Sequence, residues 1–177
     1  MKYSYLLLVP SLFLVGCGDS SQDDAPQSSY SAQSSATVSA DPVSIVDGVT
    51  VVEMTGNDQM KYNLEAFSVP AGGQVKLTFI NVGKMPKAAM GHNVVFLVAD
   101  ADAGAFATAA SSARDNGYIP VDFEDQILAK TEMLGPGESD TIEFTAPETP
   151  GEYEYICSFP AHLFAGMRGV MTVESSD

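Results

Sequence analysis

The sequence predicts an all-β protein, a β-sandwich of the Greek-key type with one helical insert. Short segments of alternating or β-branched residues are separated by turns rich in Gly and Pro, as in sandwich proteins. A single segment, residues 100–116, is rich enough in Ala to be the helix. The chain is 45% hydrophobic and 18% charged, a composition typical of a protein that forms a core.

The expected strands follow one another along the C-terminal three quarters of the chain. In 74–81 the apolar residues alternate, so that Val75, Leu77 and Phe79 point to one face. The segment 93–99 is apolar almost throughout and is expected to be buried on both faces. The other strand-like segments are 49–54, 62–69, 126–130, 140–145, 153–157 and 169–173. A turn is expected at Gly56-Asn57-Asp58.

The helical insert is expected between the strands 93–99 and 126–130. Asp100 or Asp102 can accept the first free amides as the N-cap, and Gly117 can end the helix. Phe106 is the large apolar residue that would pack the insert against the sandwich.

The N-terminal region predicts export and a lipid anchor. Residues 1–16 resemble a bacterial signal peptide: Lys2 precedes an apolar run, 5–15, shorter than the about 20 residues of a bilayer span. Leu14-Val15-Gly16-Cys17 resembles a lipobox, which implies cleavage before Cys17 and acylation of its thiol. An ordinary secretory signal with an incidental Cys is the alternative. Gly18, in place of a retention Asp, favours the outer membrane among bacterial envelope membranes.

Between the signal and the core, residues 17–47 are predicted to be a tether and residues 48–177 the folded domain. The run 18–44 is dominated by Ser, Gln, Ala and Asp and has no apolar period. Its root-mean-square reach as a flexible coil is roughly 30 Å. A lipid-held domain with that reach could meet both membrane-bound and soluble partners in the periplasm.

The charge is strongly acidic, with a formal net charge of −15 and a pI near 4.2. Such a surface disfavours nucleic acid and anionic lipid as partners. If charge selects a partner, that partner should carry a positive patch. Solubility alone explains the charge equally well.

The loop from Cys157 to Met167 carries the chemistry. It places a thiol, the imidazole of His162 and a thioether within one short segment between two strands. His92, the other histidine of the chain, lies far upstream at the start of an apolar run. Two His and one Cys with a weak Met ligand is the donor set that selects copper for electron transfer.

Other uses of these side chains are weaker. Cys157 and His162 could form a nucleophile and base, but the sequence offers no orienting group or oxyanion-hole motif. Zinc could bind two His and one Cys, although a Met adds nothing for zinc. A Cys17–Cys157 disulfide is improbable because nothing places Cys17 near the core.

The chain resembles the azurin and auracyanin branch of the blue copper proteins, the cupredoxins, over residues 49–174. The resemblance is carried by Gly56-Asn57-Asp58-Gln59-Met60, Met90-Gly91-His92-Asn93, and Cys157-x4-His162-x4-Met167. It implies that one copper ion is held by His92, Cys157 and His162 in a plane, with Met167 at the axis. The Gly91 carbonyl is implied as a further contact. The His-to-Met spacing is one residue longer than in azurin and matches auracyanin or plastocyanin.

The same resemblance assigns supporting roles. Asn93 and Phe159 are expected behind the ligands, where Asn93 would tie the two ligand-bearing segments together by hydrogen bonds. His162 is expected to have an exposed edge through which the electron passes. An apolar docking patch around it would comprise Met60, Met90, Ala161, Leu163 and Phe164. Leu163 is expected to be exposed, whereas Phe164 could equally be exposed or plug the core.

The sequence therefore favours a non-enzymatic one-electron carrier. Its copper domain would be monomeric and would serve redox proteins such as c-type cytochromes or membrane oxidoreductases. A copper enzyme such as a nitrite reductase or oxidase would need further imidazoles for a substrate-binding copper, and the chain has only two His. The first alternative is therefore a module that serves a copper-dependent reductase or oxidase whose other chain supplies those imidazoles. A copper-holding protein is another alternative, although the tether lacks the Met and His that such a role would use.

Overall fold

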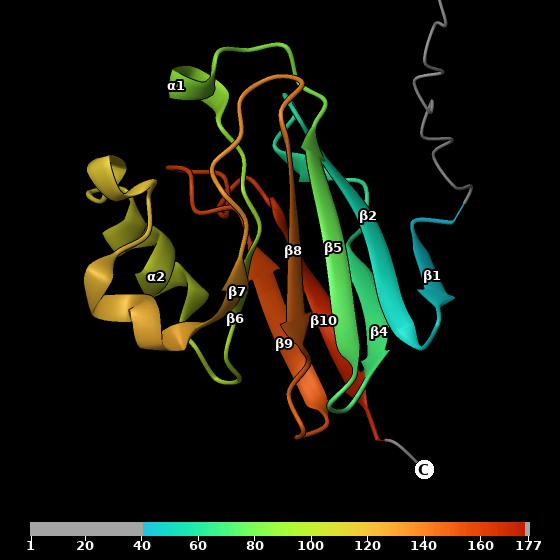
Figure 1. Cartoon of the computed structure of the whole chain (residues 1–177). Coiled ribbons are helices and arrows are strands. Elements are labelled where there is room, and N and C mark those ends of the chain that lie inside the picture. Colours follow the sequence, from blue (N-terminus) through green and yellow to red (C-terminus); the bar gives the residue numbers. More distant parts are fainter. Residues whose placement is uncertain (1–40, 176–177) are drawn as a thin grey trace, which may run out of the picture. The chain divides into compact units, whose positions relative to one another are not determined.

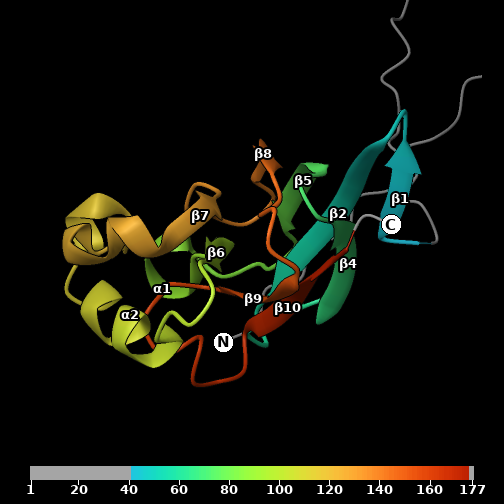
Figure 2. The same cartoon turned by 90° about the horizontal axis from the view of Figure 1, so that it is seen from below.

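The computed structural model describes residues 41–175 and shows two β-sheets facing each other (Figures 1 and 2). The first has the order β1-β2-β5-β8, with β3 paired to β2, and the second the order β4-β10-β9-β6-β7. β2 pairs with β5, and β4 with β10, in parallel; the other pairs are antiparallel. The predicted sandwich is confirmed. The strands are β1 (Val43–Val46), β2 (Val49–Asn57), β3 (Lys61–Tyr62), β4 (Ala66–Pro70), β5 (Gln74–Asn81), β6 (Val95–Leu97), β7 (Ile127–Lys130), β8 (Ser139–Thr145), β9 (Gly151–Ile156) and β10 (Arg168–Glu174).

The core lies between the sheets because the strands alternate as their sequences predict. In β5 the side chains of Val75, Leu77 and Phe79 are buried while their neighbours face outward. The predicted two-sided burial also holds for residues 93–97 at β6. Phe96 and Tyr155 fill the centre, with ring centroids 5.4 Å apart.

The sheet begins earlier than the expected domain start at residue 48. β1 pairs with β2 across a hairpin whose turn residues, Asp47 and Gly48, both have positive φ (51° and 81°). Such a turn matches the twist of a two-residue hairpin. The strand was missed because its four residues are too few to show a period and its first two belong to the polar run 18–44. The predicted signal peptide, Cys17 and the tether up to residue 40 lie outside the described residues.

The helical insert is shorter and more broken than the sequence predicts. α2 spans Ala103–Ala110, and the carboxylate of Asp102 caps it by accepting the amide of Ala105 (2.9 Å). The helix ends where the Ser111 hydroxyl bonds back to the Ala107 carbonyl, a competing interaction typical of Ser. Two 3₁₀ segments, Arg114–Asn116 and Val121–Gln126, follow.

The insert covers one flank of the sandwich, with Phe106 fully buried as expected (Figure 1). A second, four-residue helix not predicted from the sequence, α1 (Lys87–Met90), lies just before His92. Among the described residues, no helix has the length and apolar character needed to cross a membrane.

Candidate metal centre

The predicted ligands meet at one end of the sandwich, brought there by two separate segments. His92 precedes β6 and is held by a bridge in which its amide donates to the Leu134 carbonyl (3.0 Å) and its carbonyl accepts from Leu134 (2.7 Å). Cys157 directly follows β9. Its amide donates to the Met167 carbonyl (3.1 Å), which closes the loop that contains His162. Antiparallel pairing of β9 with both β6 and β10 therefore brings these segments together.

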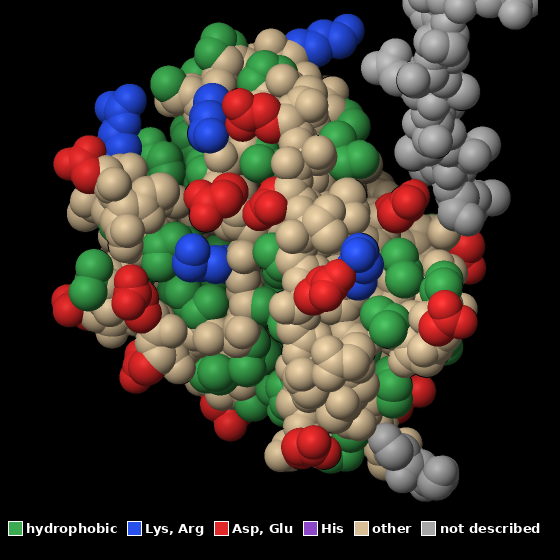
Figure 3. Space-filling view, viewed as in Figure 1, with side chains coloured by type: hydrophobic (Ala, Val, Ile, Leu, Met, Phe, Trp, Pro, Cys, Tyr) green, Lys and Arg blue, Asp and Glu red, His purple; other side chains and the backbone are tan. Residues whose placement is uncertain are grey.

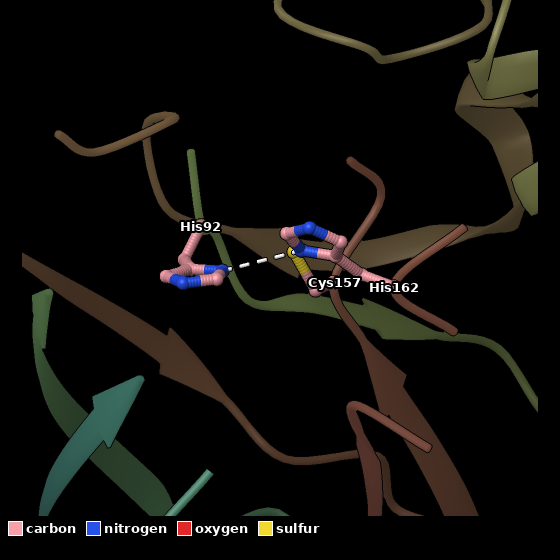
Figure 4. A group of neighbouring side chains, drawn as sticks. All are labelled: His92, Cys157 and His162. Atoms are coloured by element: carbon pink, nitrogen blue, oxygen red, sulfur yellow. Dashed lines mark hydrogen bonds between the residues drawn. The ribbon is translucent and has the colours of Figure 1, made fainter. Parts of the chain in front are cut away.

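The donor atoms face one another at short range (Figure 4). Nδ1 of His162 lies 3.2 Å from Nδ1 of His92 and 3.4 Å from Sγ of Cys157. All three side chains are buried. Two nitrogens bound about 2.0–2.1 Å from one first-row metal ion at trigonal angles lie about 3.5 Å apart. The spacing therefore fits one ion bound by both imidazoles and the thiolate.

Met167 completes the donor set from the end of the same loop. Its side chain is fully buried, and its terminal methyl lies against Gly56 of β2 and beside the Phe79 ring. Its amide donates to the His162 carbonyl at 2.9 Å. His92, Cys157, His162 and Met167 together form a type 1 copper site, for which the soft sulfur donors and imidazoles are suited.

Burial dominates the electrostatics of the ligands. It raises the pKa of the Cys157 thiol to about 12, although the amides of Asn93 and Phe159 pull in the opposite direction by favouring the thiolate. Burial, aided by the neighbouring His92, lowers the pKa of His162 to about 4. The pKa of His92 is also lowered by burial, while the Asn57 carbonyl and the Asp58 carboxylate oppose that shift. Both imidazoles are thus neutral and ready to bind metal at pH 7.

Asn93 makes the hydrogen bonds expected between the two ligand-bearing segments. Its Nδ2 donates to Oγ of Ser158 and its Oδ1 accepts from the amide of Ser158, both at 2.9 Å. The Tyr62 hydroxyl donates to the Asn93 carbonyl at 2.5 Å. These groups are buried, so each bond satisfies a polar atom that water cannot reach. The result is a fixed distance between the segment of His92 and that of Cys157.

Phe159 also lies beside the ligands, as expected. Its ring centroid is 4.6 Å from that of His162 and 4.9 Å from that of Tyr118, which comes from the insert. The aromatic pair helps to keep water from the His162 ring and limits its rotation.

The Gly91 carbonyl lies close to the centre, 4.0 Å from Sγ of Cys157. A side chain at Gly91 would collide with its surroundings, because an added Cβ would lie 2.8 Å from the Lys87 carbonyl oxygen and 3.0 Å from Sδ of Met133. The absence of a side chain therefore allows the backbone to come this near.

The expected docking patch is only partly on the surface. Phe164 is 68% exposed and Ala161 is exposed, whereas Met60 and Met90 are half-buried. The expectation of an exposed Leu163 is wrong: the side chain is 4% exposed and packs with Phe106 and its neighbours under the insert.

The expected exposed edge of His162 is also missing, since the residue is only 2% exposed. Sequence spacing could not show this, because residues of a tight loop follow no period. Phe159 was expected near the ligands, but its packing on the His162 ring and its contact with Tyr118 are known only from the fold.

Several supporting residues were not singled out from the sequence. Ser158 is adjacent to Cys157, which was a usable signal. Tyr62 and Lys61 come from the β2–β3 hairpin and act through contacts that only the fold creates: Lys61 Nζ donates to the carbonyls of Ala165 and Gly166. Asn81, at the end of β5, donates to the Leu134 carbonyl (3.0 Å) and so supports the bridge to His92.

A buried pair of imidazoles with one thiolate and a thioether, at the end of a β-sandwich, defines a type 1 copper protein. The family model for copper binding proteins of the plastocyanin/azurin family matches residues 49–174, and the chain belongs to this family.

Known relatives agree over the same region. The chain is 37% identical over 125 residues to auracyanin-B of Chloroflexus aurantiacus, which covers 70% of this chain but only 52% of that protein. It is 33% identical over 126 residues to azurin of Pseudomonas aeruginosa, covering 70% of this chain and 84% of that one. It thus spans about half of the auracyanin-B chain and most of the azurin chain.

Solved structures show the same fold. Reduced auracyanin from Roseiflexus castenholzii superposes with a TM-score of 0.58 and 35% identity, covering 72% of this chain and 97% of that one. A structure of auracyanin B gives a TM-score of 0.62 with 33% identity, and the match covers 76% of this chain and 95% of that one.

Proposed function

We propose that this protein is a one-electron carrier that shuttles electrons between redox proteins at the cell envelope. The observation that supports this best is the arrangement of the donor atoms: Nδ1 of His162 lies 3.2 Å from Nδ1 of His92 and 3.4 Å from Sγ of Cys157. Copper bound there would supply one electron per cycle. The chain's part is to keep the donors in place between the two oxidation states.

The polypeptide restrains each donor separately. The Leu134 bridge holds the backbone of His92, Phe159 packs on the ring of His162, and the amides of Asn93 and Phe159 favour the thiolate of Cys157. Small movement of the ligands means little reorganisation on electron transfer. We further propose that the Gly91 carbonyl provides a weak additional contact to the copper.

An enzymatic role lacks the ligands it would need. A substrate-binding copper requires imidazoles beyond those of the type 1 site, and both His of the chain are already used. A copper-delivery role fits poorly with donors that are all buried. Electron transfer without substrate turnover needs only one copper ion, and the four ligands of the site are sufficient to hold it.

We propose that electrons pass near His162 through a small docking face, defined as Met60, Met90, Ala161 and Phe164. His162 is covered, but its neighbour Ala161 is exposed, and Phe164 presents a large apolar surface. An apolar face of this kind suits brief contact with c-type cytochromes or membrane oxidoreductases. The copper domain would act as a monomer, without nucleic-acid partners.

The charge around this face differs from that of the rest of the domain. The loops that frame the site, 57–61, 82–91, 132–138 and 157–167, contain three Lys and three carboxylates, whereas the whole chain has a net charge of −15. Figure 3 shows carboxylates spread over the body. We therefore propose that apolar contact dominates docking, and that the acidic body affects solubility and orientation more than binding.

The location proposed is the periplasmic side of the bacterial envelope, with the outer membrane favoured. Acylation of Cys17 after removal of residues 1–16 would hold the domain through the tether. Replacing Cys17 by Ala should release a protein that still binds copper into the soluble fraction. Continued retention in membranes would refute the anchor.

The copper site is tested by spectroscopy on the copper-loaded protein. An intense thiolate-to-copper absorption band should appear with Cu(II), vanish on reduction and return on oxidation. Cys157→Ser should abolish the band, whereas Met167→Leu should shift the reduction potential and keep most of the colour. Persistence of the band in Cys157→Ser would overturn the assignment.

A further inference from the structure

We propose that the β2–β3 hairpin positions Met167, which would be the thioether ligand of the copper: Lys61 holds the backbone that leads into Met167, and Gly56 makes room for its side chain. The inference rests on the proposed copper site. It adds two positioning residues that bind no metal themselves.

The first contact is between the Lys61 ammonium and the copper loop. Nζ donates to the carbonyl of Ala165 at 3.1 Å and to that of Gly166 at 3.3 Å. No carboxylate among residues 41–175 lies within ion-pair distance of Lys61, so its hydrogen-bonding partners here are loop carbonyls. Hydrogen bonds from a charged donor are stronger than those between neutral groups. The two bonds of Lys61 hold the carbonyls of the two residues directly before Met167.

Gly166 leaves space for the ammonium. Its φ is +90°, a region that disfavours side chains, and an added Cβ would lie only 2.5 Å from Nζ of Lys61. The ammonium therefore occupies the position that a side chain at residue 166 would take.

The second contact lies on the neighbouring strand of the same hairpin. An added Cβ on Gly56 would lie 2.8 Å from the terminal methyl of Met167 and 2.9 Å from the Phe79 ring. Gly56 pairs with Tyr62, and Asn57 pairs with Lys61, so the two positioning residues belong to one hydrogen-bonded unit. The register of β2 and β3 thus places Lys61, which holds the backbone before Met167, next to Gly56, which leaves room for the Met167 side chain.

The other ligands are supported elsewhere. The Asn93–Ser158 pair and the Leu134 bridge act on the segments of Cys157 and His92. Within the loop, Met167 is held by backbone bonds to Cys157 and His162. Lys61 adds a side-chain restraint from outside the loop, so its loss should affect Met167 before the other ligands. The reduction potential of such sites depends on the axial ligand.

The test compares Lys61→Met with a matched control, Lys84→Met. Both substitutions remove one exposed Lys charge near the site, but no side-chain bond joins Lys84 to the copper loop. Amide hydrogen exchange of Gly166 and Met167 is measured in the metal-free protein, and the reduction potential and absorption spectrum in the copper form. Lys61→Met should speed exchange at these amides at least tenfold and change the spectrum and potential. Lys84→Met should leave exchange and spectrum as in the wild type, and Lys61→Arg should restore much of the protection.

Gly56→Ala tests the hairpin independently, because it leaves Lys61 in place. The added methyl should alter the spectrum by displacing the Met167 side chain. Equal exchange and equal spectra for Lys61→Met and Lys84→Met would overturn the role of Lys61, and an unchanged spectrum in Gly56→Ala would overturn that of Gly56. A wild-type protein that shows no thiolate-to-copper band would instead refute the proposed function, whatever the exchange rates.

Discussion

Replacing Asn93 by Ala should destabilise the domain more than any other single loss of a polar group around the copper site. The substitution removes two buried hydrogen bonds of 2.9 Å and leaves the amide and hydroxyl of Ser158 without their partner. An unsatisfied buried polar group costs about 1–3 kcal/mol. The buried amide of Ser158 would have no water molecule as a replacement acceptor, whereas its hydroxyl can partly reorient. We therefore expect the free energy of unfolding to fall by about 3 kcal/mol in total.

The measurement is urea unfolding of the metal-free domain, followed by circular dichroism. With a urea dependence of about 2 kcal/mol per molar, the midpoint should fall by about 1.5 M. Ser158→Ala is the matched control, since it removes the hydroxyl but keeps the bond between its amide and Asn93. It should cost about 1 kcal/mol.

The double variant shows whether the two residues act together. Because they share a bond, the combined loss should be smaller than the sum of the single losses. If Asn93→Ala costs no more than Ser158→Ala, the pair does not hold the ligand-bearing segments together and the reasoning fails.

Two further predictions concern protons and packing. Copper binding at pH 7 should release about one proton per ion, because burial keeps the thiol of Cys157 protonated (pKa about 12) while both ligand imidazoles have a lowered pKa and are already neutral. Affinity should accordingly rise about tenfold per pH unit from pH 7 to 9. Calorimetry in two buffers of different ionisation enthalpy measures the number of protons released per copper ion. A release near zero or near two protons would contradict these protonation states. Gly169→Ala should destabilise the domain by several kcal/mol, since an added Cβ would meet the Tyr155 ring and, at 2.6 Å, the Glu65 carbonyl oxygen. Thermal unfolding checks this, with Gly104→Ala as the control, because Gly104 has no positive φ and its added Cβ would meet only Oδ1 of Asp102, at 3.3 Å. Equal melting temperatures for the two variants would refute the clash.

The copper ligands were predictable because their chemistry is local. Cys157, His162 and Met167 lie within one short loop, and His92 was the one remaining imidazole. A soft thiolate together with two imidazoles limits which metal ions the site can prefer, even before any distance between the ligands is known. The core strands were predictable for a similar reason: a period of two in 74–81 already decides which side chains face inward.

The surface around the site was not predictable to the same degree. Leu163 and Phe164 are adjacent and both apolar, yet one packs beneath the helical insert and the other is exposed. The loop has no period, and the insert that covers Leu163 lies about 50 residues earlier in the chain. The direction of each side chain follows from packing between distant segments.

By itself, the sequence determined the sandwich, the donor set and hence the copper, because residue type and strand period act over a few neighbouring residues. Only the tertiary structure decided that His162 is covered, that Asn93 joins Ser158, and that Lys61 reaches the copper loop. The hydrogen bonds of Asn93 and Lys61 join residues 65 to 105 positions apart, and strand pairing is what brings them within hydrogen-bond distance.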